Sequence, residues 1–168
     1  IAIKKKTEKK PILQSYVVLG CKCVERTHKD GYVFDVINAV LGRGSSSRLF
    51  NEIRTKRGLV YNISSHYESG TDYGFFGVSF SIDKKNIKKA NSLIFAEFDK
   101  LKKGDVSAKE LADAKNSIEG SYKLENEDNK RRADSLFFWE VIKSAGLEKD
   151  YIKRIRKVTK EDIKRVAG

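Results

Sequence analysis

The chain of 168 residues is long enough to bury a hydrophobic core, and 39% of its residues are apolar, so one domain is expected. Its longest apolar run falls well short of the roughly 20 residues that a transmembrane helix needs, so no membrane partner is expected. A formal net charge of +12 suggests nucleic-acid binding as one function to consider. The basic residues are dispersed and mostly lysine, however, which is typical of solvated helix faces, so nucleic acid is the weaker interpretation.

The two ends of the chain suggest a piece of a longer protein. The sequence starts at Ile1 rather than at methionine and contains no methionine. Residues 1–11 form a basic segment, and the domain is assigned to residues 12–168. At least one further strand is expected beyond Gly168, because few strands accompany many helices. A cytoplasmic location is the default expectation for the parent.

The first predicted element is a strand over residues 12–24, which are rich in β-branched and aromatic residues. It carries the two cysteines of the chain, Cys21 and Cys23, on one face. Residues two apart on a strand suit a disulfide poorly, and the spacing to His28 and His66 matches no familiar zinc site. We therefore expect two reduced, half-buried thiols in an intracellular protein.

Two helices are predicted next. Asp30 can cap the first, whose apolar residues recur at helical spacing: Val33, Val36, Ile37 and Val40. Gly42 and Gly44 end it. The serines that follow offer a cap for a second helix, which runs to Gly58 and has an apolar stripe of Leu49, Phe50 and Ile53.

A β-hairpin is the clearest prediction in the sequence. From Leu59 the period changes to two, which places Tyr61 and Ile63 on the same face as Leu59. Residues 69–72, SGTD, predict a turn. The alternation then resumes with a second apolar set: Phe76, Val78, Phe80 and Ile82. Two such strands form an antiparallel hairpin with one buried face.

The rest of the chain is predicted to be helical. One helix runs from Ile87 to Leu101, and Ser107 opens the next. Further helical segments are expected over 129–146, over 148–157 and from Thr159 onwards. A strand, helices, a hairpin and a helical run predict an α+β fold, with helices packed on one face of a mainly antiparallel sheet.

The GRGSSS stretch before the second helix could bind a phosphate, because a helix N-terminus presents free N–H groups. It lacks the GK[ST] ending of a Walker A loop and has only the first spacing of GxGxxG. A helix-breaking turn with serine caps explains the same residues without a ligand. Both interpretations stay open at this point.

Arg54 and Tyr61 form the other candidate site. Arg54 lies near the end of the second helix and Tyr61 three residues past Gly58, so the chain folds back between them. An ordinary ion pair and a tyrosine at the edge of the core would explain them. Alternatively, a cation and a phenol can donate hydrogen bonds to a carbonyl oxygen as it becomes an oxyanion. No HxxEH motif, paired carboxylates or activated nucleophile accompanies them, so they could not hydrolyse a bond alone.

The segment SSRLFNEIRTKRGLVYNISS, residues 46–65, resembles the signature of the C-terminal, non-zinc half of M16 metallopeptidases, the family of pitrilysin, insulinase and mitochondrial processing peptidase. The resemblance extends over roughly residues 12–168, although the family's last strand is absent. It implies the fold of a LuxS/MPP-like metallohydrolase half. It also implies a homologous partner half, on the same chain or a separate subunit, that encloses a peptide substrate with this one.

In such enzymes the zinc lies in the other half, on an HxxEH helix whose glutamate activates the metal-bound water. The corresponding helix here, DGYVFDVINAVL, has no metal ligand, so the resemblance implies no zinc in this domain and no activity alone. Arg54 and Tyr61 occupy the positions that stabilise the substrate carbonyl. By resemblance to glycine-rich loops of non-catalytic processing-peptidase subunits, the peptide would contact Gly42, Gly44, Ser45 and Ser46. A non-enzymatic scaffold subunit of the same fold is the alternative.

Overall fold

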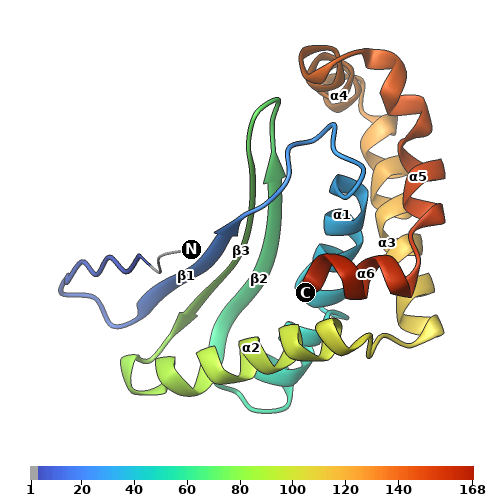
Figure 1. The fold of residues 1–168 in the computed structure, drawn as a ribbon. Coiled ribbons are helices and arrows are strands. Elements are labelled where there is room, and N and C mark those ends of the chain that lie inside the picture. Colours follow the sequence, from blue (N-terminus) through green and yellow to red (C-terminus); the bar gives the residue numbers. More distant parts are fainter. Residues whose placement is uncertain (1–3) are drawn as a thin grey trace.

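The structure, a computed structural model, describes residues 4–168 and contains an antiparallel sheet of three strands with helices on one face (Figure 1). The strands are β1 (Ser15–Lys22), β2 (Val60–Ser69) and β3 (Gly74–Ile82). Their order is β1-β3-β2, so β3 lies in the middle. The predicted basic segment begins with residues 1–3, which lie outside the described part, and residues 4–11 are exposed without helix or strand.

The helical elements, in chain order, are α1 (Gly31–Leu41), the π-helix η1 (Phe50–Thr55), the 3-10 turn η2 (Lys84–Asn86), α2 (Ile87–Lys103), α3 (Ala108–Glu127), α4 (Asn129–Ile142), the 3-10 turn η3 (Ala145–Asp150), α5 (Tyr151–Lys157) and α6 (Lys160–Ala167). α1 lies between the sheet and the helices α3, α5 and α6, and α2 crosses below it in the view of Figure 1. No helix in residues 4–168 is both long and apolar enough to cross a membrane. The α+β prediction is confirmed.

The hairpin packs its apolar face onto the helices. The four apolar side chains predicted to face the core from β3 are all buried: Phe76, Val78, Phe80 and Ile82. In β2 the predicted alternation is wrong at its start, because Val60 and Ile63 are buried while Tyr61 is 60% exposed. The register shifts between Val60 and Asn62, which pair with the consecutive residues Ile82 and Ser81 of β3. Tyr61 is therefore an extra residue in β2, which forms a β-bulge. The extra residue moves Tyr61 away from the core face.

The starts predicted at Asp30, Ser107 and Thr159 are correct, whereas the helix predicted over 148–157 begins only at Tyr151, after the 3-10 turn η3. Asp30, however, uses its carboxylate for something other than a cap. Asp30 is the N-cap of α1 without a side-chain cap. Its two oxygens accept hydrogen bonds of 2.9 and 2.7 Å from the Arg165 guanidinium on α6. The hydrogen bonds from Arg165 stabilise the ionised carboxylate of Asp30 and therefore lower its pKa. The bridge joins the last helix to the N-terminus of the first, whereas Thr159 and Asp162 form the complete capping box of α6.

A buried cation holds α1, β2 and the C-terminal helices together. The Arg26 Nη2 atom lies 2.9 Å from the Asp35 carboxylate of α1, and their side chains are 7% and 16% exposed. The guanidinium carbon lies 5.0–5.9 Å from the centres of four aromatic rings: Tyr32, Tyr67, Trp139 and Tyr151. Cation–π attraction therefore adds to the ion pair, since the guanidinium is buried and the four rings are buried or partly buried.

Gly42 lies where α1 approaches the backbone of β2 most closely. A Cβ at this position would lie 2.4 Å from the Ser65 nitrogen and 2.5 Å from its Oγ. We expect Gly42→Ala to lower the free energy of unfolding by about 1–3 kcal/mol, because backbone must move to relieve the overlap. Chemical denaturation measures this change. Gly120→Ala in α3, where a Cβ meets open space, is the control and should be stabilising. Equal effects at the two glycines would contradict the close packing.

Candidate functional site

The helix that carries Arg54 is irregular. Residues 48–49 begin it as an α-helix, and Phe50–Thr55 continue as a π-helix in which the Lys56 amide donates to the Asn51 carbonyl at 2.9 Å. Leu49 and Ile53 anchor it in the core, since both are fully buried. π-Helical turns are rare and occur frequently at functional sites. The π-helical geometry therefore makes this segment a candidate for part of a functional site.

Arg54 is exposed and holds its charge without a partner carboxylate. Its guanidinium carbon lies 4.7 Å from the centre of the Phe50 ring, one turn back. Within residues 4–168, Arg54 takes part in none of the ion pairs, which use other basic side chains. Its donors are thus available to a group from outside this chain.

Tyr61 is equally accessible, because the bulge in β2 turns it outward. Bulges are found next to active sites, where they re-aim a side chain. η1 packs against β2, and the Leu59 amide donates to the Ile53 carbonyl at 3.1 Å. The structure therefore places Arg54 and Tyr61 on adjoining elements, and within residues 4–168 the ordinary ion pair expected for Arg54 is not formed.

The loop over residues 42–47 divides into structural and exposed parts. Gly42 is buried against β2, and Gly44 has a φ of 84°, which favours glycine. Ser47 is buried and donates its Oγ hydrogen to the Gly44 carbonyl at 2.7 Å, so it closes the turn. Ser45 and Ser46 are exposed. Of the four residues predicted to contact a peptide, these two serines and Gly44 are accessible.

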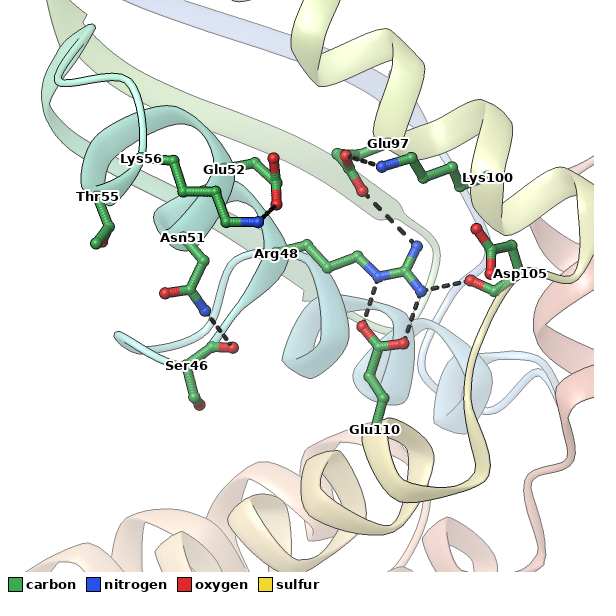
Figure 2. Close-up of a pocket in the computed structure, with 10 residues that line it drawn as sticks. All are labelled: Ser46, Arg48, Asn51, Glu52, Thr55, Lys56, Glu97, Lys100, Asp105 and Glu110. Atoms are coloured by element: carbon green, nitrogen blue, oxygen red, sulfur yellow. Dashed lines mark hydrogen bonds and ion pairs between the residues drawn. The ribbon is translucent and has the colours of Figure 1, made fainter.

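A hollow of about 420 Å³ lies beside η1, between it and the α2–α3 connection (Figure 2). All the residues that line it have polar or charged side chains: Ser46, Arg48, Asn51, Glu52, Thr55, Lys56, Glu97, Lys100, Asp105 and Glu110. Neither Arg54 nor Tyr61 lines it. Hydrogen bonds from Lys56 and then Arg57 lower the pKa of Glu52 to about 2, so this carboxylate is ionised.

Arg48, the central residue of this hollow, was not among the candidate residues predicted from the sequence. Its guanidinium binds the Glu110 carboxylate at 2.5 and 2.6 Å. Glu110 lies in the first turn of α3, where its amide donates to the Ser107 Oγ at 3.1 Å. The sequence shows only that an arginine precedes Leu49. Its partner Glu110 lies 62 residues away along the chain, so no local pattern indicates the contact.

The described residues do not fit a zinc ion. Within residues 4–168 no three His, Cys, Asp or Glu side chains are grouped so that they could hold a metal. His66 Nε2 instead lies 2.9 Å from Ser64 Oγ and 3.0 Å from Ser79 Oγ. The two cysteines are free, Cys21 exposed and Cys23 partly buried. Burial raises the pKa of Cys23 to about 11, so its thiol stays protonated near neutral pH.

Comparison with known proteins decides the family. The sequence profile described as the peptidase M16 inactive domain matches residues 2–118. The chain belongs to the M16 peptidase family. As an inactive M16 domain it is a part of the zinc-protease family that lacks the metal site, and in this family the zinc belongs to the active half.

Relatives share both the sequence and the fold of this M16 domain. An uncharacterized zinc protease of Streptomyces coelicolor is 32% identical over 158 residues, which are 92% of this chain and 34% of that protein. A protease of Helicobacter pylori has a crystal structure with a TM-score of 0.86 and 26% identity, over 95% of this chain and 38% of that one. The M16 inactive domain of Pseudomonas fluorescens has a TM-score of 0.77 and 26% identity, over 92% and 37%. The chain thus spans about a third of the length of these relatives.

Proposed function

We propose that this M16 domain is the non-catalytic half of a zinc-dependent endopeptidase, in which Arg54 and Tyr61 stabilise the scissile carbonyl of a peptide. The observation that carries the proposal is their joint exposure. A guanidinium and a phenol lie on adjoining irregular elements, and neither side chain is buried. A subunit that served only as a scaffold would not need this pair, because the hydrogen-bond donors of both side chains point to a use by a group outside the chain.

The chemistry divides between the two halves. A zinc ion, where the partner half holds one, would supply the activated water for the reaction. Attack on the amide carbon moves negative charge onto the carbonyl oxygen. The Arg54 guanidinium and the Tyr61 hydroxyl then donate hydrogen bonds to that oxygen, and they bind it more strongly as the charge develops. This chain moves no proton and forms no covalent bond.

The uncovered face of the sheet supports a role as one wall of the peptide chamber. The outward positions of the three paired strands include two charged residues, Lys22 and Glu68, although 35% of all residues are charged. Tyr16 and Val18 are largely exposed there, and a Cβ on Gly20 or Gly77 would overlap the Phe75 ring, which lies across both. A partly aromatic face with few charges suits contact with a peptide backbone and its neutral side chains.

Reconstitution tests the proposal. This chain should be combined with an HxxEH-bearing half of its family, and hydrolysis of a fluorogenic peptide should be measured with zinc and after chelation. We expect hydrolysis only when both halves and zinc are present, because each half lacks part of the machinery. Full hydrolysis by the zinc half alone would show that this chain contributes nothing to the reaction. Hydrolysis by this chain alone would also contradict the proposal.

A further inference from the structure

One side of η1 faces open space rather than packed side chains. The hollow of about 420 Å³ separates this helix from α2 and from the first turn of α3 (Figure 2). From η1 and the turn before it the lining includes Arg48, Asn51 and Glu52, and from the opposite side it includes Glu97 and Glu110. An open gap supplies none of the close contacts that keep a buried helix from rotating.

Arg48 spans that gap. Its Nε and Nη2 atoms donate to the two oxygens of Glu110 at 2.5 and 2.6 Å, and Nη2 also donates to the Asp105 carbonyl. Its Nη1 atom lies 3.7 Å from the carboxylate of Glu97, which is buried on α2. In residues 4–168, each of the hydrogen bonds and ion pairs that cross this hollow is made by Arg48.

The position of Arg48 on the helix connects it to Arg54. Leu49 and Ile53 form the core side, whereas Arg54 is exposed and lies against the half-buried Phe50 ring. Burial of these apolar side chains holds the helix against the core, but the hydrophobic effect is non-directional and does not fix the rotation of the helix about its axis. By contrast, two hydrogen bonds between a planar guanidinium and a carboxylate hold the guanidinium in one orientation. Arg48 makes this contact with Glu110, and it lies six residues before Arg54 on the same helical segment.

We propose that Arg48 is a positioning residue, which fixes the rotation of η1 through its two-pronged bond to Glu110 and thereby the direction in which Arg54 leaves the helix. The inference rests on the proposed function, because it concerns the same donor. A displacement of about 1 Å in a group that positions the reacting atoms can cost roughly 10²-fold in rate. Core packing at Leu49 and Ile53 preserves the helix itself when Arg48 is changed.

A double-mutant cycle in the assembled two-half enzyme tests this role. Arg48→Lys keeps the charge but loses the planar fork, and Glu110→Gln weakens the same bond from the other side. We expect each to lower kcat about tenfold with little change in KM, because substrate still binds while the donor is misaligned. In an Arg54→Ala background the same two changes should alter kcat less than about twofold, since no guanidinium is left to align.

Asp113→Asn is the matched control, because it removes an exposed ion pair with Lys109 from the same end of α3 and should leave kcat unchanged. Unfolding midpoints of all variants separate misfolding from misalignment. A loss of kcat that is equal with and without Arg54 overturns the inference, as does wild-type kcat in both Arg48→Lys and Glu110→Gln. Wild-type kcat in Arg54→Ala itself would instead refute the proposed function, and Arg48 would then have no donor to align.

Discussion

Arg54→Ala should lower kcat of the assembled peptidase by roughly 10²–10³-fold, the usual cost of removing one donor to a developing oxyanion. KM should change much less, because the interaction strengthens only as the oxygen gains charge. Tyr61→Phe removes a single hydroxyl and leaves the ring in place, so at least a tenfold loss in kcat is expected there too. Steady-state hydrolysis of a fluorogenic peptide by the two-half enzyme measures both.

Lys56→Ala provides the control for a change of charge on the same segment. Lys56 is an exposed cation two residues after Arg54, and it binds Glu52. Its removal should leave kcat within about twofold, since exposed pairs contribute little. Full activity in both Arg54→Ala and Tyr61→Phe would show that the pair is structural. The scaffold interpretation would then be preferred over a role in the reaction.

Arg26→Met should produce the largest loss of stability of any single change considered for this chain. It leaves the Asp35 carboxylate without its cation, and breaking a buried pair from one side costs about 3–5 kcal/mol. The loss should appear as a fall of roughly 6–20 °C in the thermal unfolding midpoint, followed by circular dichroism. Attraction between the cation and four aromatic rings is lost as well.

The double variant Arg26→Met/Asp35→Leu separates the unpaired charge from the packing. Replacing both members by apolar side chains should recover much of the loss, because no carboxylate then remains buried without a partner. Arg154→Met is the matched control: this exposed arginine lies 5.3 Å from the Tyr32 ring and should cost less than about 1 kcal/mol. Similar losses for Arg26→Met and Arg154→Met would mean that burial of the pair does not decide its contribution.

Local patterns predicted the parts of the fold that local physics determines. The apolar spacing of α1, the alternation in β3 and the helix start at Thr159 each involve residues a few positions apart, and the structure confirms them. The bulge at Tyr61 could not be predicted this way, because a bulge exists only relative to the residues of the partner strand. The cluster around Arg26 was missed since its aromatic rings come from distant elements.

The candidate site shows the same division. The motif around Arg54 and Tyr61 gave the two residue types and their spacing, and the resemblance to M16 peptidases gave their role as a prediction. Nothing local indicated that Arg54 would be free of a carboxylate while Arg48 would bind Glu110, because that choice depends on how α2 and α3 fold back onto η1. The π-helical turn was also beyond local reasoning, since its apolar stripe fits an α-helix as well.

The π-helix and the β-bulge have a shared consequence for how this domain tolerates insertions and deletions. Each holds one residue more than the regular element would, so each is what a single-residue insertion into an α-helix or a strand leaves behind. Deleting one residue from either would yield a more regular element. The deletion in β2 would restore strict alternation, and Tyr61 would either be lost or turn toward the core. A deletion that makes β2 regular would therefore remove Tyr61 from the donor pair.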